Sequence, residues 1–257
     1  YYPLVASIGE TGDLVGTRLR EGRAHPAAEA PGWIPELVDR AKRHVCQVGL
    51  VRMDAGFTDD TTLSALEDRG VPYLGRLRSN AVLQRQAAPH LKRPRGRPPN
   101  EPREWAIEQS YQADSWGHPR RVILIVQERP DELFLHHFWL VTSLDPQRYG
   151  PEQVLALYRQ RGKAEGHMGE LKDVLAPRLS ATSRGVASDD EVFARNEAWL
   201  LLHLLAYQAM HALRVPLEQI TGRGWSIKSL RERVLKTAAR IHQHARRIQV
   251  VIPRTAV

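Results

Sequence analysis

The sequence lacks the features of secreted, disulfide-bonded or membrane-spanning proteins. Its 257 residues include a single cysteine, Cys46, so no disulfide can form within the chain and a reducing cytoplasm is the expected setting. Nothing in it resembles a signal peptide, an internal repeat or a glycine-rich nucleotide loop. The most apolar run, residues 198–210, is too short to cross a bilayer and contains His203, so we expect a buried helix there.

Acidic residues are absent from one stretch of the chain and nearly absent from another. Residues 76–100 contain seven Lys or Arg and no acid, and residues 221–257 contain nine with one acid, Glu232. These two segments carry +15 of formal charge, so the rest of the chain carries −7 against a total of +8. Two basic segments on an otherwise acidic body predict a polyanionic partner.

The first 77 residues show alternating strand and helix patterns. Residues 1–19 predict a β-hairpin, and the helix at 31–45 precedes a strand at 48–53 that ends at Asp54. A capped helix at 58–69 and a strand at 71–77 follow. This order predicts a mixed sheet with helical crossovers.

Asp54 is the candidate functional residue of this region. In sheets with helical crossovers, functional groups lie at the carboxyl ends of strands, and Asp54 is at such an end. An isolated Asp in this position is more often a helix cap or a turn residue. Asp59 and Asp60 fit the capping role better because they lie at the helix start, so we assign Asp54 to function.

The middle of the chain is basic and then rich in strand formers. Residues 78–104 are proline-rich, which predicts a loop or flexible arm. Within it, residues 92–98 resemble an AT-hook whose Arg95 and Arg97 would lie in the minor groove of A·T-rich DNA, although a solvated basic linker explains them equally well. Apolar runs at 121–127 and 133–141 predict a β-rich insertion.

The C-terminal part has helical patterns. We expect one helix at 152–175, a long core helix at 189–213, and an amphipathic helix at 226–248 with a basic stripe that includes Arg240 and Arg247. Glycines at 162, 166 and 169 lie inside the first helix, each at a cost of up to about 1 kcal/mol relative to Ala, which indicates close approach by another backbone or by DNA. The expected segments are therefore 1–77, 78–145 and 146–257.

The helix at 152–175 carries four residues at regular spacing: Tyr158, Arg161, Glu165 and Lys172. At roughly 100° per residue they occupy about 60° of arc, so an aromatic ring, two cations and a carboxylate share one face. One interpretation is a solvated face with an Arg161–Glu165 pair worth a few tenths of a kcal/mol. The other is an anion-binding face around one metal-binding carboxylate.

The order and spacing of these residues, Y-x2-R-x3-E-x6-K, resemble the YREK signature of bacterial insertion-sequence transposases of the DDE class. The resemblance extends over essentially the whole chain, including the segments around Asp54, the β-rich insertion and the C-terminal helices. It implies an α/β ribonuclease-H-like fold, in which a mixed sheet is followed by a β-rich insertion, the catalytic helix and a helical C-terminal region. It also implies DNA cleavage and strand transfer at transposon ends.

The resemblance assigns roles residue by residue. Asp54 and Glu165 would be the second and third metal-binding acids, and both would be catalytic. The residues expected to contact DNA are Tyr158, Arg161, Lys172, Trp116, Arg120 and Arg121, together with Arg95, Arg97, Arg240 and Arg247 of the basic segments. The expected partners are double-stranded DNA, as terminal inverted repeats and as target, and a second copy of the chain in the synaptic complex. A bacterial, nucleoid-associated location in the cytoplasm follows.

The carboxylates predict a magnesium site, with Mn²⁺ as a substitute. Two such ions roughly 4 Å apart would activate a water or 3′-hydroxyl and stabilise the leaving oxygen. One cysteine and the absence of paired-histidine spacing argue against zinc.

One departure from the family pattern concerns the first Asp, which lies on the opening strand in these transposases. No Asp precedes Asp13, and Asp13 falls in a predicted turn. We therefore expect the chain to be a piece of a longer protein and inactive by itself. Two alternatives stay open: a ribonuclease-H-like nuclease unrelated to transposition, and a non-catalytic DNA-binding remnant.

Overall fold

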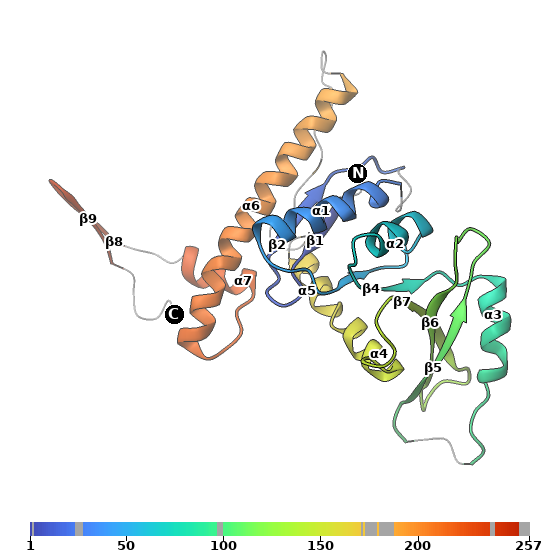
Figure 1. Ribbon diagram of the computed structural model, residues 1–257. Coiled ribbons are helices and arrows are strands. Elements are labelled where there is room, and N and C mark those ends of the chain that lie inside the picture. Colours follow the sequence, from blue (N-terminus) through green and yellow to red (C-terminus); the bar gives the residue numbers. More distant parts are fainter. Residues whose placement is uncertain are drawn as a thin grey trace. The chain divides into compact units, whose positions relative to one another are not determined.

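The computed structural model describes residues 1, 3–23, 28–96, 100–170, 172, 179, 188–236 and 240–251, except for the side chains of residues 163–165 and 168 (Figure 1). The chain forms two compact units. We call Arg23–Arg161 the sheet unit, and Tyr1–Gly22 with Gly162–Val257 the hairpin unit. The boundaries of these units differ from those of the predicted segments 1–77, 78–145 and 146–257, which remain a prediction.

The sheet unit is built on five strands in the order β3-β4-β7-β6-β5. Only β3 and β4 are parallel, and α2 (Asp60–Glu67) connects them. The other neighbours are antiparallel. The strands are β3 (Val51–Met53), β4 (Tyr73–Leu77), β5 (Arg103–Tyr111), β6 (Arg120–Glu128) and β7 (His136–Thr142). The predicted β-rich insertion therefore contributes strands to the same sheet as β3 and β4.

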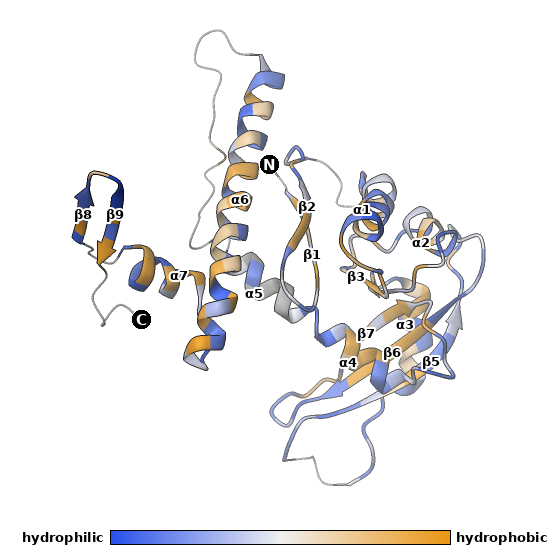
Figure 2. Cartoon of the chain, turned by 60° about the vertical axis from the view of Figure 1, so that its left-hand side comes forward, coloured by the Kyte–Doolittle hydropathy of each residue, from blue (hydrophilic) through white to orange (hydrophobic). Residues whose placement is uncertain are grey.

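Helices cover both faces of this sheet. On one face, α1 (Ala30–His44), α2 and α3 (Ala81–Ala87) pack against alternate residues of β4, β6 and β7. On the other face, α4 (Pro151–Arg159) packs Val154, Leu155 and Tyr158 against the other alternate residues of the same three strands. Strand β6 lies between β7 and β5, and its run 122–126 is fully buried, as the continuous apolar sequence predicts. Figure 2 shows this strand as hydrophobic.

The hairpin unit combines a two-stranded sheet with helices. Strands β1 (Leu4–Ser7) and β2 (Leu14–Arg18) pair antiparallel. Helix α6 (Asp189–Thr221) begins with a capping box at Ser188 and ends at Gly222 in the left-handed conformation. Its core contacts include Leu19, Trp225 and residues of α7 (Ile227–Leu230). Along the described parts of the chain, no helix is long and apolar enough to cross a membrane.

Helix α6 differs from the predicted core helix in two ways. It continues to Thr221, eight residues beyond the predicted end at 213. Only one side of it is buried, because Leu202, Leu205 and Ile220 on the other side are 57%, 67% and 77% exposed. The apolar run predicted a buried helix, but some of its apolar side chains form an exposed stripe.

Three further sequence predictions need correction. Residues 78–104 are not loop throughout, because Asn80 caps α3, whose Leu83 and Ala87 are buried, and the 3-10 turn η1 (Ala88–His90) follows. The single helix at 152–175 is divided, since α4 ends at Arg159 and α5 (Gly162–Glu170) begins after a turn. The three glycines of the predicted helix all lie in the second part, α5.

The predicted amphipathic helix at 226–248 is also wrong over most of its length. Helix α7 is followed by a π-helical turn, η3 (Arg231–Leu235), and then by the hairpin of β8 (Arg240–His244) and β9 (Arg247–Val251). Ile241 and Ile248 fit a helical spacing, but the alternation of Ile248 and Val250 fits a strand. β-Branched residues favour the strand.

Candidate active site

Asp54 immediately follows β3 and has an exposed side chain. Its Oδ1 accepts a hydrogen bond from the amide of Ala55 at 2.8 Å, and its carbonyl accepts one from Phe57 at 3.0 Å. The chain then packs on β4 at Gly75, where an added Cβ would lie 2.4 Å from the side chain of Thr58. The strand end predicted for Asp54 is confirmed. Asp59 caps α2 through a bond from Thr62, as predicted.

Helix α4 is attached to the same strand through Arg52. The Nη1 atom of Arg52 donates to the carbonyl of Leu157 at 3.1 Å and to the side chain of Gln160 at 3.4 Å. Arg52 lies two residues before Asp54 on β3. This link places the last turn of α4, which contains Tyr158, beside the strand that carries Asp54.

Cations and aromatic rings surround this corner of the sheet unit. The guanidinium of Arg76 lies 5.0 Å from the ring centre of Phe138, which is 6.3 Å from the ring centre of Tyr158. The guanidinium of Arg161 lies 5.7 Å from the Tyr158 ring. Such contacts hold guanidinium groups over aromatic faces, an arrangement that is common where arginines bind phosphates.

The electrostatics of Tyr158 connect Asp54 with these cations. Burial raises the pKa of the Tyr158 phenol, and the negative charge of Asp54 acts in the same direction. The charges of Arg161 and Arg76 oppose this shift and lower the pKa. Asp54, Arg76 and Arg161 therefore all act on one phenol, which remains protonated and able to donate a hydrogen bond at neutral pH.

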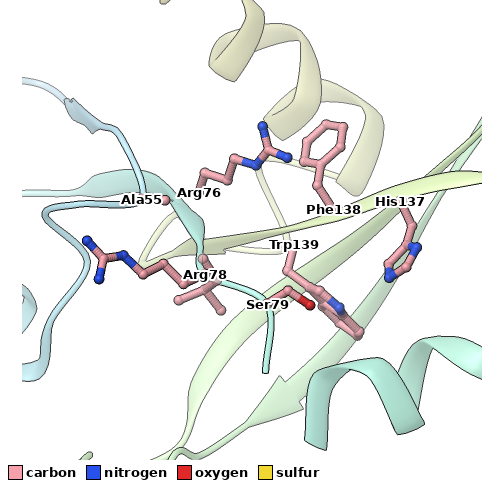
Figure 3. A pocket seen from close by; sticks show the side chains of 8 residues that line it. Ala55, Arg76, Arg78, Ser79, His137, Phe138 and Trp139 are labelled. Atoms are coloured by element: carbon pink, nitrogen blue, oxygen red, sulfur yellow. The ribbon is translucent and has the colours of Figure 1, made fainter. Parts of the chain in front are cut away.

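A pocket opens next to Asp54 (Figure 3). Its walls are Ala55, the end of β4 with Arg76 and Arg78, and the start of β7 with His137 and Phe138. Burial, together with the charge of His136, lowers the pKa of His137, so its imidazole is neutral at pH 7. A pocket with two exposed arginines and an aromatic wall suits a nucleic-acid strand, whose phosphates bind cations and whose bases stack on rings.

The family model "Transposase DDE domain group 1" matches residues 1–257, the whole chain. The chain belongs to the DDE transposase domain family. A search of curated proteins found no match. Membership links this transposase domain to DNA transposition, to DNA as a partner and to the divalent metal ions that DDE transposases generally use. The mixed sheet flanked by helices is compatible with a ribonuclease-H-like fold.

The second predicted acid, Glu165, belongs to α5, but its side chain lies outside the described residues. Residue 165 and Asp54 also belong to different units, so a shared metal ion remains a prediction. Within the described part of the chain, no group of three His, Cys, Asp or Glu could hold a metal. Lys172 is exposed, and Arg97 lies outside the described residues.

The structure gives Trp116, Arg120 and Arg121 internal contacts that argue against the predicted DNA contacts. Arg120 is 4% exposed and is held by Asp60 and Glu67, with its guanidinium 5.0 Å from the ring centre of the buried Trp116. Arg121 donates to the carbonyls of Leu144 and Tyr149 and to Glu108. Sequence patterns do not distinguish a buried, paired arginine from an exposed one.

Besides Lys172, three of the predicted DNA contacts are exposed in the described part of the chain. Arg95 is exposed in the loop that precedes β5. Arg240 and Arg247 are exposed on β8 and β9, and the pairing of His244 with Arg247 places both arginines on one face of the hairpin.

Sequence reasoning missed Arg76 as a site residue. Arg76 lies one residue beyond Gly75, which pairs with Met53 in the parallel β3–β4 ladder. A strand–helix–strand unit brings the carboxyl ends of its strands together, so the order of elements contained the signal. Arg76 did not stand out in the sequence because it is one of seven basic residues in the segment 76–100.

Proposed function

We propose that this chain is the catalytic domain of an insertion-sequence transposase that cuts and joins DNA at the corner formed by β3, β4 and α4. The observation that carries the proposal is the position of Asp54, exposed at the end of β3, the strand that Arg52 joins to the last turn of α4. A generic nuclease also needs a carboxylate, but it has no need of the Tyr–Arg pair on α4 and the turn after it.

Each side chain has a distinct task in this proposal. Arg161 and Arg76 would hold phosphate oxygens of the transposon end, for which a guanidinium fork is well suited. Tyr158, protonated at neutral pH, would donate a hydrogen bond to the backbone of the same strand. Lys172 would supply a further positive charge. The exposed Arg95, Arg240 and Arg247 would add contacts to flanking phosphates.

Asp54 fits a hard divalent cation because its carboxylate is exposed and accepts a single local hydrogen bond at Oδ1. Asp54 and Glu165 would hold Mg²⁺ or Mn²⁺ together with a further carboxylate. When bound there, the metal would polarise the scissile phosphate and activate the attacking hydroxyl. The chain's own cations would orient the strand and neutralise its charge.

Substitutions at the two kinds of residue test the proposal in the intact transposase, with duplexes that carry the ends of its element. Asp54→Asn and Glu165→Gln should abolish cleavage and leave DNA binding within a few-fold. Arg161→Ala should weaken end binding by roughly 1–3 kcal/mol, the usual loss for a charge-assisted contact. Arg40→Ala is the matched control, because Arg40 pairs with Glu36 on the surface of α1.

Three results would reject or redirect the proposal. Cleavage that survives Asp54→Asn would remove Asp54 from the chemistry. End binding and cleavage unchanged in Arg161→Ala would reduce the signature to a chance pattern. Binding without cleavage in every preparation would favour the non-catalytic remnant.

A further inference from the structure

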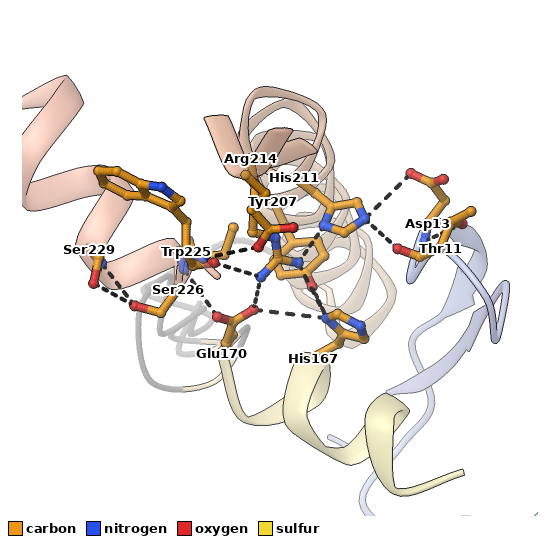
Figure 4. A network of polar contacts seen from close by, with 12 residues as sticks. Thr11, Asp13, His167, Glu170, Tyr207, His211, Arg214, Trp225, Ser226 and Ser229 are labelled. Atoms are coloured by element: carbon orange, nitrogen blue, oxygen red, sulfur yellow. Dashed lines mark hydrogen bonds and ion pairs between the residues drawn. The ribbon is translucent and has the colours of Figure 1, made fainter. Parts of the chain in front are cut away.

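Helix α5 carries the signature carboxylate at position 165, yet its own sequence barely supports a helix. It has nine residues, GKAEGHMGE, of which three are glycine. Isolated helices this short are marginal in water even without glycine. Contacts of its side chains with the rest of the unit therefore stabilise it. His167 and Glu170 reach a cluster centred on Arg214 of α6 (Figure 4).

Arg214 is the buried cation of this cluster, with 8% of its side chain exposed. Its Nη1 donates to Glu170 Oε2 at 2.8 Å and to the carbonyl of Trp225 at 3.4 Å. Its Nη2 faces Nδ1 of His211 and, at 3.4 Å, Nδ1 of His167. A buried guanidinium is costly unless it is paired, so the Glu170 contact holds α5 against α6.

Glu170 also reaches a third element. Its Oε2 accepts from Arg214, while its Oε1 accepts the backbone amide of Ile227 at 3.0 Å. Ile227 is the first residue of α7 and is fully buried. One carboxylate therefore joins α5, α6 and α7. Loss of its charge would weaken both hydrogen bonds, because the buried guanidinium of Arg214 and the buried amide of Ile227 would then lack a charged acceptor.

His167 adds contacts to the β1–β2 turn and to α6. Its Nδ1 lies 3.0 Å from the hydroxyl of Tyr207, which is almost fully buried. Its ring also covers Gly12, where an added Cβ would lie 2.5 Å from Nε2. Because Arg214 can only donate, Nδ1 of His167 accepts and the ring is neutral. Burial lowers the pKa of His167, and the charges of Arg214 and His211 lower it further against the influence of Glu170.

His211 completes the connection to the hairpin. Its Nδ1 accepts from Arg214, and its Nε2 donates to the carbonyl of Thr11 at 2.8 Å. The carboxylate of Asp13 lies 3.8 Å from the same nitrogen. The titratable and charged groups that face His167 are therefore Glu170 of α5, Tyr207, His211 and Arg214 of α6, and, through His211, Asp13 of the turn.

We propose that Glu170 and Arg214 are positioning residues that fix α5, and with it residue 165, for strand cleavage. The inference rests on the proposed role of Glu165 and adds two residues outside the Tyr–Arg–Glu–Lys signature. Neither contacts DNA in this proposal. They act through the backbone of α5, in which Glu170 and His167 are the described side chains with polar contacts to α6.

Hydrogen exchange of the α5 amides tests the positioning role independently of any activity. Arg214→Ala should speed exchange across residues 162–170 by at least about tenfold, which corresponds to about 1.4 kcal/mol of local opening. Arg195→Ala is the matched control, because Arg195 is exposed on the same helix α6. If Arg214→Ala does not fold, Glu170→Gln and Arg214→Lys, which keep size or charge, should show the same change to a smaller extent. Unchanged exchange in all the folded variants overturns the inference.

Cleavage kinetics in the intact transposase provide the second readout. Glu170→Gln and Arg214→Lys should lower kcat at least about tenfold with an unchanged KM for DNA, because neither residue touches the strand. A raised KM with normal kcat would contradict the positioning role. Cleavage that survives Glu165→Gln would instead defeat the proposed function, and the exchange result would still stand.

Discussion

Replacing Arg120 with alanine removes the cation from a buried ion cluster of the sheet unit. The Arg120 guanidinium donates to Asp60 at 2.6 Å, to Glu67 at 2.8 Å and to Ser64 at 2.9 Å. Its side chain is 2% exposed, whereas those of Asp60 and Glu67 are 30% and 24% exposed. The substitution therefore leaves two carboxylates without their shared cation, and Trp116 without the guanidinium that covers its ring.

The expected cost follows from this geometry. Breaking a buried pair by removing one partner costs about 3–5 kcal/mol, because the remaining charge stays partly out of water. Both carboxylates reach solvent in part, so we expect about 3 kcal/mol. At roughly 3 °C per kcal/mol for a chain of this size, the Tm of the Arg120→Ala variant should fall by about 9 °C.

Thermal unfolding followed by circular dichroism measures this change. Arg40→Ala is the control, because the ion pair of Arg40 with Glu36 is about half exposed on both sides and should shift Tm by about 1 °C or less. DNA affinity at a temperature where Arg120→Ala is fully folded should equal that of the wild type. A Tm loss no larger than the control, or a specific loss of DNA affinity, would refute the structural role and restore the sequence-based one.

Three further measurements follow from other features. Burial alone would raise the pKa of Glu67, but hydrogen bonds from Arg120 and Tyr73 hold it below 4.5. A lowered pKa stabilises the folded state at pH values above the pKa of the unfolded state, so the free energy of unfolding should fall as the pH drops below about 4.5. It should fall less steeply in Arg120→Ala. Gly12→Ala should lower the free energy of unfolding by about 1–3 kcal/mol, because φ is +83° and the methyl group would press on His167; Gly117→Ala, which meets no neighbour, should change it little, and equal losses would contradict this account. DNA affinity should fall with salt, with a log–log slope of about 0.9 for each phosphate contacted, and a flat response would argue against binding through the basic segments.

The sequence predicted the parts of the fold that depend on local patterns. The apolar run before Asp54 predicted a strand ending there, and the capping pattern at Asp59 predicted the start of α2. The predictions failed where two patterns compete. Residues 240–251 fit both a helical and an alternating spacing, and the spacing from Tyr158 to Lys172 continues across the turn that separates α4 from α5.

The candidate site was only partly predictable because burial is a tertiary property. Arg120 and Arg76 are both basic residues on strands, but only packing shows that the first is enclosed by Asp60 and Glu67 while the second faces a pocket. The cluster around Arg214 brings together groups that are separated by up to 200 residues, as in the contact of the His211 ring with the carbonyl of Thr11. No spacing rule connects such positions.

Strand β3 has a consequence for inhibitor design. It is three residues long and pairs with β4 on one side; on its other side, no strand pairs with it anywhere in the described ranges. An open edge of this kind accepts an added strand, which would lie about 4.8 Å from β3 and could end beside Asp54. A short extended peptide that supplies matching backbone hydrogen bonds and a terminal carboxylate would therefore place its charge at the candidate metal-binding corner. Such a peptide would compete with any strand that completes the sheet at this edge.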